Sequence, residues 1–386
     1  MNVVFISPNF PPNYYVFPVR LREEGATVLG IGDAPWEALR PELRAVLAEY
    51  VRVPDMNQHD AMVRALGYLT WKHGKIDRLD SNNEHWLPLE ASLRRAFNVP
   101  GQKPEDTEVN RSKSRMKQRF LDAGIPCGPG EPLRDAEHAR AFARTYGYPL
   151  IVKPDVGVGA GGALKVEDAA ALERALARLA EGLVIEQFLA GELFSFDGLT
   201  DESGRIAFCT AHVFNDGILE VVTGLGPMHY YSLREIPADL ERTGRATVEA
   251  FAIRGRFFHI EFFRLADGSL RALEVNVRPP GGFTTDMMNF ATDSDVYRLW
   301  ARIVTGQPLP AEPPTRKFHV AHASRRYHLS YALGHEALLA RLGALCVLHT
   351  EMAAALSGAM GDYVYLLRSA ELPELRAAIA EVERAG

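Results

Sequence analysis

The segment from Phe257 to Arg278 constrains the fold more than any other part of the sequence. Two runs rich in aromatic and β-branched residues flank Asp267-Gly268, a dipeptide typical of two-residue hairpin turns. The pattern therefore predicts two antiparallel strands. Counting back from a two-residue turn places Glu261 directly opposite Glu274.

Two carboxylates at directly opposite positions repel each other and destabilise the strand pair. A hard cation between them would remove this cost, and oxygen ligands on a rigid hairpin suit magnesium. The same count puts His259 opposite Asn276, while Asn276 and Arg278 share a face with both acids. The face expected to be apolar carries Leu273, Val275 and Val277. The alternative is a solvated sheet face with two unrelated acids.

Composition indicates which cellular compartment and which classes of binding partner to expect. With 386 residues, the chain is long enough for two or three domains. A net charge of -6 favours neither nucleic acid nor an anionic membrane surface, and the sequence shows neither a secretory leader pattern nor an apolar run of membrane-spanning length. Three widely spaced cysteines form no metal-binding pattern and suggest a reducing compartment: Cys127, Cys209 and Cys346. We expect a cytoplasmic protein without nucleic-acid or membrane partners.

Residues 1–101 alternate between strand and helix patterns, as is typical of an α/β domain. The expected strands are 3–6, 27–31 and 76–79, and the expected helices are 15–24, 41–50 and 84–97.

Three further regions follow. Residues 102–190 are predicted to form an α+β lobe with strands at 150–153, 163–166 and 183–186 and helices at 113–123, 136–146 and 168–179. Residues 191–310 are expected to hold antiparallel strands and a helix at 239–253. After a proline-rich linker, residues 311–386 are predicted to form a C-terminal subdomain with a strand at 318–323 and a helix at 371–384.

A glycine-rich loop follows the strand that ends at Lys153, and it contains Gly157, Gly159, Gly161 and Gly162. Glycines let backbone N–H groups approach phosphate oxygens closely, and such a loop can close over phosphates. No Gly-Lys-Ser/Thr follows, so this is not a Walker motif, and a mobile hairpin tip explains the loop equally well on its own. Lys153 strengthens the phosphate interpretation, because an unpaired ammonium group among apolar strand residues is costly without an anionic ligand.

Three other residues carry less information on their own. Lys113 precedes a predicted helix, where neighbouring basic residues favour a solvated basic face. Glu186 ends a predicted strand and Glu192 follows it. Such a connection can offer backbone groups to a purine and a carboxylate to a ribose, although both acids are also ordinary for a loop.

In this order and at this spacing, the four elements resemble the ATP-grasp superfamily. The resemblance covers about residues 102–310, and the first hundred residues are similar to the pre-ATP-grasp domain. It rests on Lys113 and the Ala-Gly-Ile-Pro after its helix, Tyr148-Pro-Leu-Ile-Val-Lys-Pro with its glycine loop, Val184-Ile-Glu-Gln-Phe-Leu-Ala-Gly-Glu192, Glu261, and Glu274-Val-Asn-Val-Arg-Pro-Pro-Gly-Gly282. The resemblance implies a Rossmann-like N-terminal domain followed by a two-lobed ATP-grasp fold.

The resemblance also implies where ATP binds. Lys113, Lys153 and the glycine loop would contact the phosphates. Glu186 and the backbone near Phe188 would hold the adenine, and Glu192 would bind the ribose hydroxyls.

For the reacting end of the nucleotide, the resemblance implies a metal site and two catalytic residues. Glu261, Glu274 and Asn276 would ligate magnesium, with manganese as an alternative. Arg278 would steady the transferring phosphoryl group and would act together with Lys153.

The run from Asn276 to Gly282 resembles that of the carboxylate–amine ligases, although Pro279-Pro280 departs from the commoner pattern. The resemblance implies a ligase in which a carboxylate attacks ATP to give an acyl phosphate and ADP, and an amine then displaces phosphate. The sequence identifies neither small-molecule substrate and is compatible with a homodimer. In the tail, His322, Arg325 and Arg326 could reach a substrate carboxylate, but a surface basic cluster is the favoured interpretation.

Two rival functions stay open at this point. Strands 3–6 and 27–31 with Asp33 suggest an NAD(P)-dependent oxidoreductase, but the turn from Ser7 to Pro12 lacks Gly-x-Gly-x-x-Gly, and its prolines remove N–H donors. A nucleotide-binding protein without turnover is the second rival, and the complete set of lysines and acids argues against it.

Overall fold

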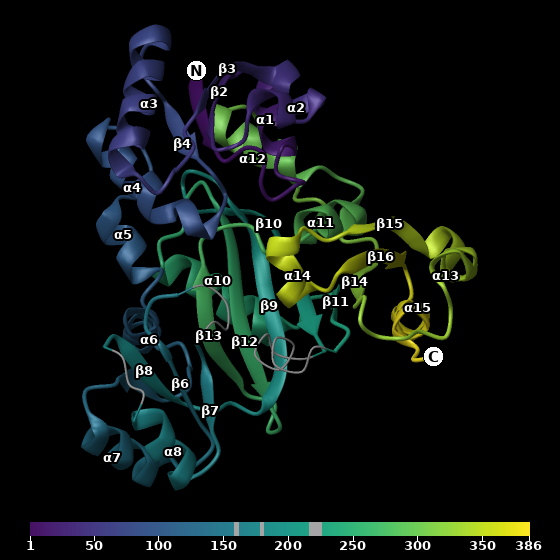
Figure 1. The fold of residues 1–386 in the computed structure, drawn as a ribbon. Helices are drawn as coiled ribbons and strands as arrows, with labels where there is room; N and C mark the ends of the chain where they lie inside the picture. Colours follow the sequence, from purple (N-terminus) through teal and green to yellow (C-terminus); the bar gives the residue numbers. More distant parts are fainter. Residues whose placement is uncertain (158–161, 178–180, 216–225) are drawn as a thin grey trace.

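The structure is a computed structural model and describes residues 1–157, 162–177, 181–215 and 226–386. Its strands form three sheets (Figure 1): a four-stranded sheet near the N-terminus, a small four-stranded sheet, and an eight-stranded sheet that extends into the C-terminal region. Helices pack on all three sheets. This mixed α/β architecture confirms the predicted fold class.

The first sheet is parallel and has the order β3-β2-β1-β4. Its strands are β1 (Asn2–Ile6), β2 (Thr27–Gly32), β3 (Leu47–Arg52) and β4 (Arg78–Asp80). The connecting segments contain α1 (Val16–Glu23), α2 (Pro41–Val46), α3 (His59–His73) and α4 (Leu87–Ala96), with the short turns η1 (Trp36–Ala38) and η2 (Glu84–Trp86). Apolar residues of β1 are buried on both faces because helices cover both sides.

One predicted helix of this region is wrong in part. The predicted helix 41–50 ends at Val46, and the chain continues as strand β3, where Tyr50 and Val51 lie beside β2. Aromatic and β-branched residues favour strands, and pairing with β2 satisfies the backbone groups. The structure also contains α3, which the sequence analysis does not predict.

The strand order of this sheet reverses between β1 and β4. At such a switch point the segments that follow the two strands diverge and border a crevice at the carboxyl edge. Here they are residues 7–13 and 81–86. Ser7 and Asn82 have φ values of 52° and 55°, so each segment bends sharply through the left-handed region.

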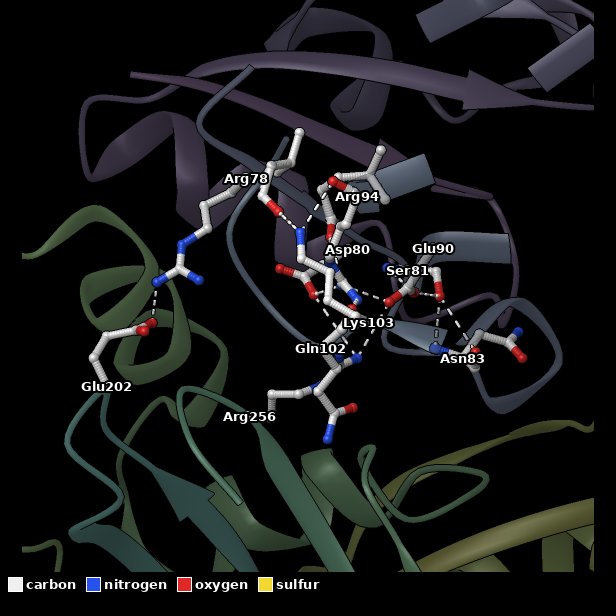
Figure 2. A network of polar contacts seen from close by, with 12 residues as sticks. Arg78, Asp80, Ser81, Asn83, Glu90, Arg94, Gln102, Lys103, Glu202 and Arg256 are labelled. Atoms are coloured by element: carbon white, nitrogen blue, oxygen red, sulfur yellow. Dashed lines mark hydrogen bonds and ion pairs between the residues drawn. The ribbon is translucent and has the colours of Figure 1, made fainter. Parts of the chain in front are cut away.

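A buried network of charges joins this first domain to the large sheet (Figure 2). Glu90 of α4 accepts hydrogen bonds from Arg94 at 2.6 Å and from Arg256, which precedes β12, at 3.3 Å. Arg94 also pairs with Asp80 at 2.7 Å, and Glu90 accepts the backbone N–H of Ser81 at 2.7 Å. Burial alone would raise the pKa of Glu90, but the two guanidinium groups hold it below its usual range. Two acids and two arginines therefore neutralise each other and fix the segment that follows β4.

The second sheet is antiparallel and has the order β5-β8-β6-β7. Its strands are β5 (Gly130–Pro132), β6 (Leu150–Pro154), β7 (Leu164–Val166) and β8 (Leu183–Gln187). The helices of this region are α5 (Pro104–Val109), α6 (Lys113–Asp122), α7 (Ala136–Tyr146) and α8 (Ala169–Leu176). Leu150 and Val152 pack with α7 and α8, so strand alternation directs Ile151 and Lys153 to the opposite face.

The third sheet is antiparallel and has the order β13-β12-β9-β10-β11-β14-β16-β15. Its strands are β9 (Gly191–Thr200), β10 (Ile206–Phe214), β11 (His229–Ser232), β12 (Phe257–Leu265), β13 (Leu270–Asn276), β14 (His319–Arg325), β15 (Cys346–Glu351) and β16 (Tyr363–Ser369). One face packs against α10 (Ala238–Ala250) and α15 (Leu372–Glu383), and the other packs against α11 (Thr284–Thr292).

The C-terminal region contributes strands to this same sheet. Strands β14, β15 and β16 follow β11 in the sheet order, so the segment predicted as a subdomain at 311–386 does not form a separate layer. The other elements are α12 (Val296–Thr305), α13 (His335–Leu342), η3 (Gly343–Leu345) and α14 (Ala354–Met360). Helix α12 lies beside α1 of the first domain (Figure 1), where the rings of Phe17 and Trp300 are 5.0 Å apart.

Candidate active site

A cleft between the small sheet and the large sheet gathers most of the predicted site residues. Its volume is about 250 Å³. The small sheet and the connection after β8 contribute Lys153, Glu186 and Phe188, and the large sheet contributes Glu261 and Glu274. The cleft is also lined by Lys113, Gly157, Asn276 and Arg278.

The hairpin of β12 and β13 has the predicted pairing at the site. Glu261 lies opposite Glu274, and His259 lies opposite Asn276. All four residues line the cleft. The predicted row of polar residues is therefore present on one face of the hairpin.

The turn of this hairpin differs from the prediction. It holds three residues instead of two, since the N–H of Leu265 donates to the carbonyl of Ser269 at 2.9 Å and Gly268 has a φ of 82°. A β-bulge then inserts Leu273 as an extra residue and restores the predicted register. The expectation that Leu273 marks the core face is wrong, because the bulge turns it into the cleft, where it joins the same apolar cluster as Phe263.

The protein neutralises the two facing carboxylates only in part, because His259 pairs with Glu261 alone. Burial raises the pKa of Glu274 to about 7; the negative charge of Glu261 adds to this rise, and Lys113 and Lys153 oppose it. Glu261 accepts a hydrogen bond from Nε2 of His259 at 3.1 Å. The predicted repulsion between the acids is therefore a feature of the structure.

The hairpin offers part of the ligand set for a cation, and oxygen atoms from outside the protein would complete it. Among the described residues, no group of three His, Cys, Asp or Glu side chains is placed to hold a metal ion. The candidate set is instead the carboxylates of Glu261 and Glu274 with the amide of Asn276. Magnesium is commonly held by one or two carboxylates, with water and phosphate oxygens completing its shell. A cation here would also lower the pKa of Glu274 and relieve the repulsion.

Lys153 has a partner in the protein that the sequence analysis does not identify. Its Nζ lies 2.7 Å from Oε2 of Glu186 on the neighbouring strand β8, and Nζ of Lys117 lies 3.4 Å from Oε1 of the same acid. Burial would lower the pKa of Lys153, but Glu186 raises it. The argument that Lys153 needs a ligand because it is unpaired is therefore wrong. Two lysines share one acid, so this wall of the cleft keeps a positive charge, while the adenine contact of Glu186 stays a prediction.

The start of α6 meets the glycine loop at the edge of the cleft. Lys113 is 8% exposed, and its Nζ donates to the carbonyl of Gly157 at 3.3 Å. Gly162 has a φ of 77° and does not line the cleft. Gly159 and Gly161 lie outside the described residues, so their predicted phosphate contacts and the closure of the loop stay predictions.

Phe188 reaches the cleft, whereas Glu192 does not. The N–H of Phe188 donates to the carbonyl of Pro149 at 3.2 Å, so this backbone donor is already engaged, and its ring lies 4.3 Å from Nζ of Lys165. Glu192 is exposed at the start of β9 and is not among the lining residues. The adenine contact at Phe188 and the ribose contact at Glu192 remain predictions.

Arg278 connects the hairpin to the switch point of the first domain. Its Nη2 and Nε donate to Oε2 of Glu84 in η2 at 2.7 and 3.0 Å. Burial would lower the pKa of Arg278, but Glu84 raises it. The sequence analysis does not single out Glu84, because the two residues are 194 positions apart and share no local pattern.

The sequence analysis also misses a group of buried polar residues on the cleft face of the large sheet. Asp197 accepts hydrogen bonds from Nδ1 of His259 at 2.5 Å, from Nδ1 of His212 at 2.7 Å and from the hydroxyl of Ser195. Burial opposes the charges, yet their attraction raises the pKa of His259 to about 9 and holds that of Asp197 below its usual range. The available signal is the alternation of polar and apolar residues along 193–199, which the sequence analysis does not use.

The three tail residues do not form the expected surface cluster. His322, Arg325 and Arg326 are all buried, and none of them lines the cleft. Nε2 of His322 pairs with the carbonyl of Met360 at 3.0 Å, and both arginines donate to backbone carbonyls of the C-terminal region. Their partners are therefore parts of the fold.

Comparisons with known proteins agree with this fold. A family described as the carbamoyl-phosphate synthase L chain, ATP binding domain, matches residues 112–192. Among solved structures, an L-amino acid ligase from Bacillus licheniformis superposes with a TM-score of 0.77 and 16% identity, over 99% of this chain and 96% of that chain. Residues 112–192 are thus similar to an ATP-binding domain, and the chain as a whole shares the fold of this ligase.

Two curated relatives of this chain are named as ligases. A D-alanine–D-alanine ligase from Streptomyces griseus subsp. griseus is 30% identical over 199 residues, which cover 46% of this chain and 50% of that protein. An L-arginine-specific L-amino acid ligase from Bacillus subtilis is 24% identical over 251 residues, covering 62% and 60%. The chain thus spans about half the length of these curated relatives. None of the helices in the described ranges is long and apolar enough to pass through a membrane.

Proposed function

We propose that the protein is an ATP- and magnesium-dependent ligase that joins a carboxylate to an amine through an acyl phosphate. The observation that carries this proposal is the facing pair Glu261 and Glu274, which lies in one cleft with Lys153 and Lys113. Facing acids that the protein compensates only in part, opposite basic residues, are suited to a metal that bridges them to phosphate oxygens.

The chain's own residues would mainly bind and orient ATP. Lys113 and Lys153 would neutralise phosphate charge from one wall of the cleft. Glu261, Glu274 and Asn276 would hold magnesium from the other wall. The ion, when bound, supplies positive charge to the terminal phosphates. Phosphoryl transfer depends largely on such positioning and charge neutralisation.

Two displacements would complete the reaction. A carboxylate oxygen attacks the γ-phosphorus and ADP leaves, and the amine then attacks the acyl carbon and phosphate leaves. Arg278 would lie beside both steps, because its planar guanidinium group suits phosphoryl and carboxylate oxygens alike. Glu84 holds that group in place from the first domain. The similarity to L-amino acid ligases makes amino acids the first substrates to test.

The rival functions have less support. The segment after β1 keeps its prolines at the switch point, which leaves few N–H donors for a dinucleotide pyrophosphate. A nucleotide-binding protein without turnover would use the same cleft, so only a turnover measurement separates it from a ligase.

The test is a screen of carboxylate and amine pairs with ATP and magnesium, beginning with the standard amino acids. We expect one group of pairs to release phosphate and ADP in equal amounts, with a product whose mass equals that of the pair less one water. Stoichiometric AMP would overturn the acyl-phosphate route. ATP binding without turnover for any pair would favour the binding protein, and NAD(P)H consumption without ATP use would favour the oxidoreductase.

A further inference from the structure

We propose that His212 is a catalytic base that takes a proton from the amine substrate. This inference rests on the proposed ligase function. It adds a residue in β10 to a reaction whose other groups come from two parts of the cleft. We call Lys113 and Lys153 the lysine wall, and the β12–β13 hairpin with Glu261, Glu274 and Asn276 the metal hairpin. The inference depends on the tautomer of His212, on its unpartnered nitrogen and on its position in the sheet.

The tautomer of His212 follows from its neighbour. Nδ1 lies 2.7 Å from Oδ2 of Asp197, and His212 is 1% exposed. An ionised carboxylate only accepts hydrogen bonds, so Nδ1 carries the proton and Nε2 carries the lone pair. Asp197 is also paired with His259, and this second partner already offsets its negative charge. A carboxylate that orients a histidine in this way also stabilises the imidazolium ion formed on proton transfer.

Nε2 of His212 is buried and has no hydrogen-bond partner among the described residues. The side chain lines the cleft. A buried acceptor without a partner is destabilising, and a ligand that brings an N–H group would satisfy it. A carboxylate or a phosphate oxygen would place a second acceptor against this lone pair. The site therefore favours the amine over the acid.

The sheet register places His212 beside the expected position of the phosphoryl group. Glu261 pairs with Ser195 on β9, and Ser195 pairs with His212 on β10. Two strand spacings of about 4.8 Å therefore separate His212 from the metal-hairpin acid along this row. Phe214 and Tyr230 line the cleft next to His212.

The titratable groups around His212 come from three strands. Asp197 on β9 is in direct contact, Tyr230 on β11 has its ring centroid 5.8 Å away, and His259 on β12 lies beyond Asp197. Burial raises the pKa of Tyr230 above its usual range, so Tyr230 stays neutral.

The proton balance is complete without another reactant. The amine binds as an ammonium ion, and one proton passes to Nε2 of His212. The free amine attacks the acyl carbon, the C–N bond forms, and the C–O bond to phosphate breaks. The second amine proton leaves with the phosphate as hydrogen phosphate, and the imidazolium ion of His212 releases its proton to solvent after the amide departs.

The first test separates the two half-reactions with His212→Gln. Hydroxylamine is uncharged at neutral pH and traps an acyl phosphate without a base. With hydroxylamine, ATP, magnesium and the acid of the productive pair, the variant should form hydroxamate within about twofold of the wild type. With the amine of that pair, amide formation at pH 7 should fall by about 100-fold or more, the contribution typical of a general base. The loss should shrink as pH rises, because the amine then deprotonates in solution.

The outcomes distinguish this inference from the ligase proposal. Amide formation at the wild-type rate in the variant, or equal losses of hydroxamate and amide, would overturn the role of His212. Absence of hydroxamate with the wild-type protein would overturn the ligase proposal itself. His349→Gln removes an exposed histidine of β15 and should leave both rates unchanged.

A second measurement needs neither substrate nor variant activity. Long-range 1H–15N correlation spectra of the ligand-free wild-type protein should show His212 as the Nδ1–H tautomer at pH 7, and His212→Gln assigns the signal. A proton on Nε2 at this pH would contradict the inference.

Discussion

Two of the buried charge clusters in the described part of the chain differ in how far the protein neutralises them. At the domain junction, Glu90 and Asp80 face Arg94 and Arg256, so two acids meet two arginines (Figure 2). On the metal hairpin, Glu261 and Glu274 face each other across a strand pair. The residues of the junction lie outside the cleft lining, whereas Glu261 and Glu274 line the cleft.

The carboxyl groups of the two clusters respond to burial in opposite ways. The pKa of Glu90 lies below its usual range because Arg94 and Arg256 outweigh burial, whereas burial and Glu261 raise the pKa of Glu274 to about 7. A compensated cluster holds domains together without further help. An uncompensated cluster indicates a site that an external cation would complete.

The largest change in the free energy of unfolding is expected where an acid that is paired with buried arginines is removed. Glu90→Gln would leave Arg94 and Arg256 buried beside a neutral group, and breaking a buried pair in this way lowers the free energy of unfolding by about 3–5 kcal/mol. Chemical denaturation measures the change. Glu105→Gln, which removes the exposed partner of Arg95, is the control and should have little effect. Equal stability of the two variants would contradict the role assigned to the junction.

On the metal hairpin, the corresponding change should affect turnover and not stability. Glu274→Gln removes a metal ligand and a like-charge repulsion together, so magnesium-dependent ATP turnover should fall by about 100-fold or more. The thermal midpoint without magnesium should stay the same or rise. Normal turnover in this variant would show that the metal assignment is wrong.

A smaller effect is expected on the lysine wall. Lys153→Met removes one charge-assisted contact to phosphate, and ATP affinity measured by calorimetry should fall by about tenfold or more. Lys165→Met removes an exposed lysine near Phe188 and should change the affinity less. If both variants bind ATP as the wild type does, Lys153 serves only its pair with Glu186.

The smallest expected effect is a dependence of stability on pH. Because the folded pKa of Glu274 lies above its usual value of 4.5, at about 7, the folded state holds this proton more tightly than the unfolded chain. Its contribution to stability is therefore complete below about pH 4.5 and is lost as pH rises through about 7. The difference in thermal midpoint between wild type and Glu274→Gln, measured without magnesium, should grow in favour of the variant over this range. A constant difference would argue against a raised pKa.

The sequence predicted those parts of the site that depend on local pattern. Strand alternation was sufficient to place Glu261 opposite Glu274, and the pairing survived an incorrect turn because a bulge at Leu273 compensates for the extra loop residue. The bulge itself has no clear local signal, so Leu273 was assigned to the wrong face.

Contacts between distant segments could not be predicted in this way. Glu84 reaches Arg278 only because the switch point of the first domain meets the end of the hairpin. Lys153 and Glu186 become neighbours only when β6 pairs with β8. His212 and Asp197 lie on strands whose shared face is set by the whole sheet, so a single-strand pattern shows their burial and not their contact.

The most direct test of the account follows oxygen from the acid substrate. If the metal hairpin and the lysine wall bring a carboxylate to the γ-phosphorus of ATP, the acid of the productive pair, labelled with 18O in its carboxylate, should transfer one 18O atom to the released phosphate. Mass spectrometry of that phosphate measures the transfer. Phosphate without 18O, in a reaction that still forms the amide, would contradict an acyl-phosphate intermediate.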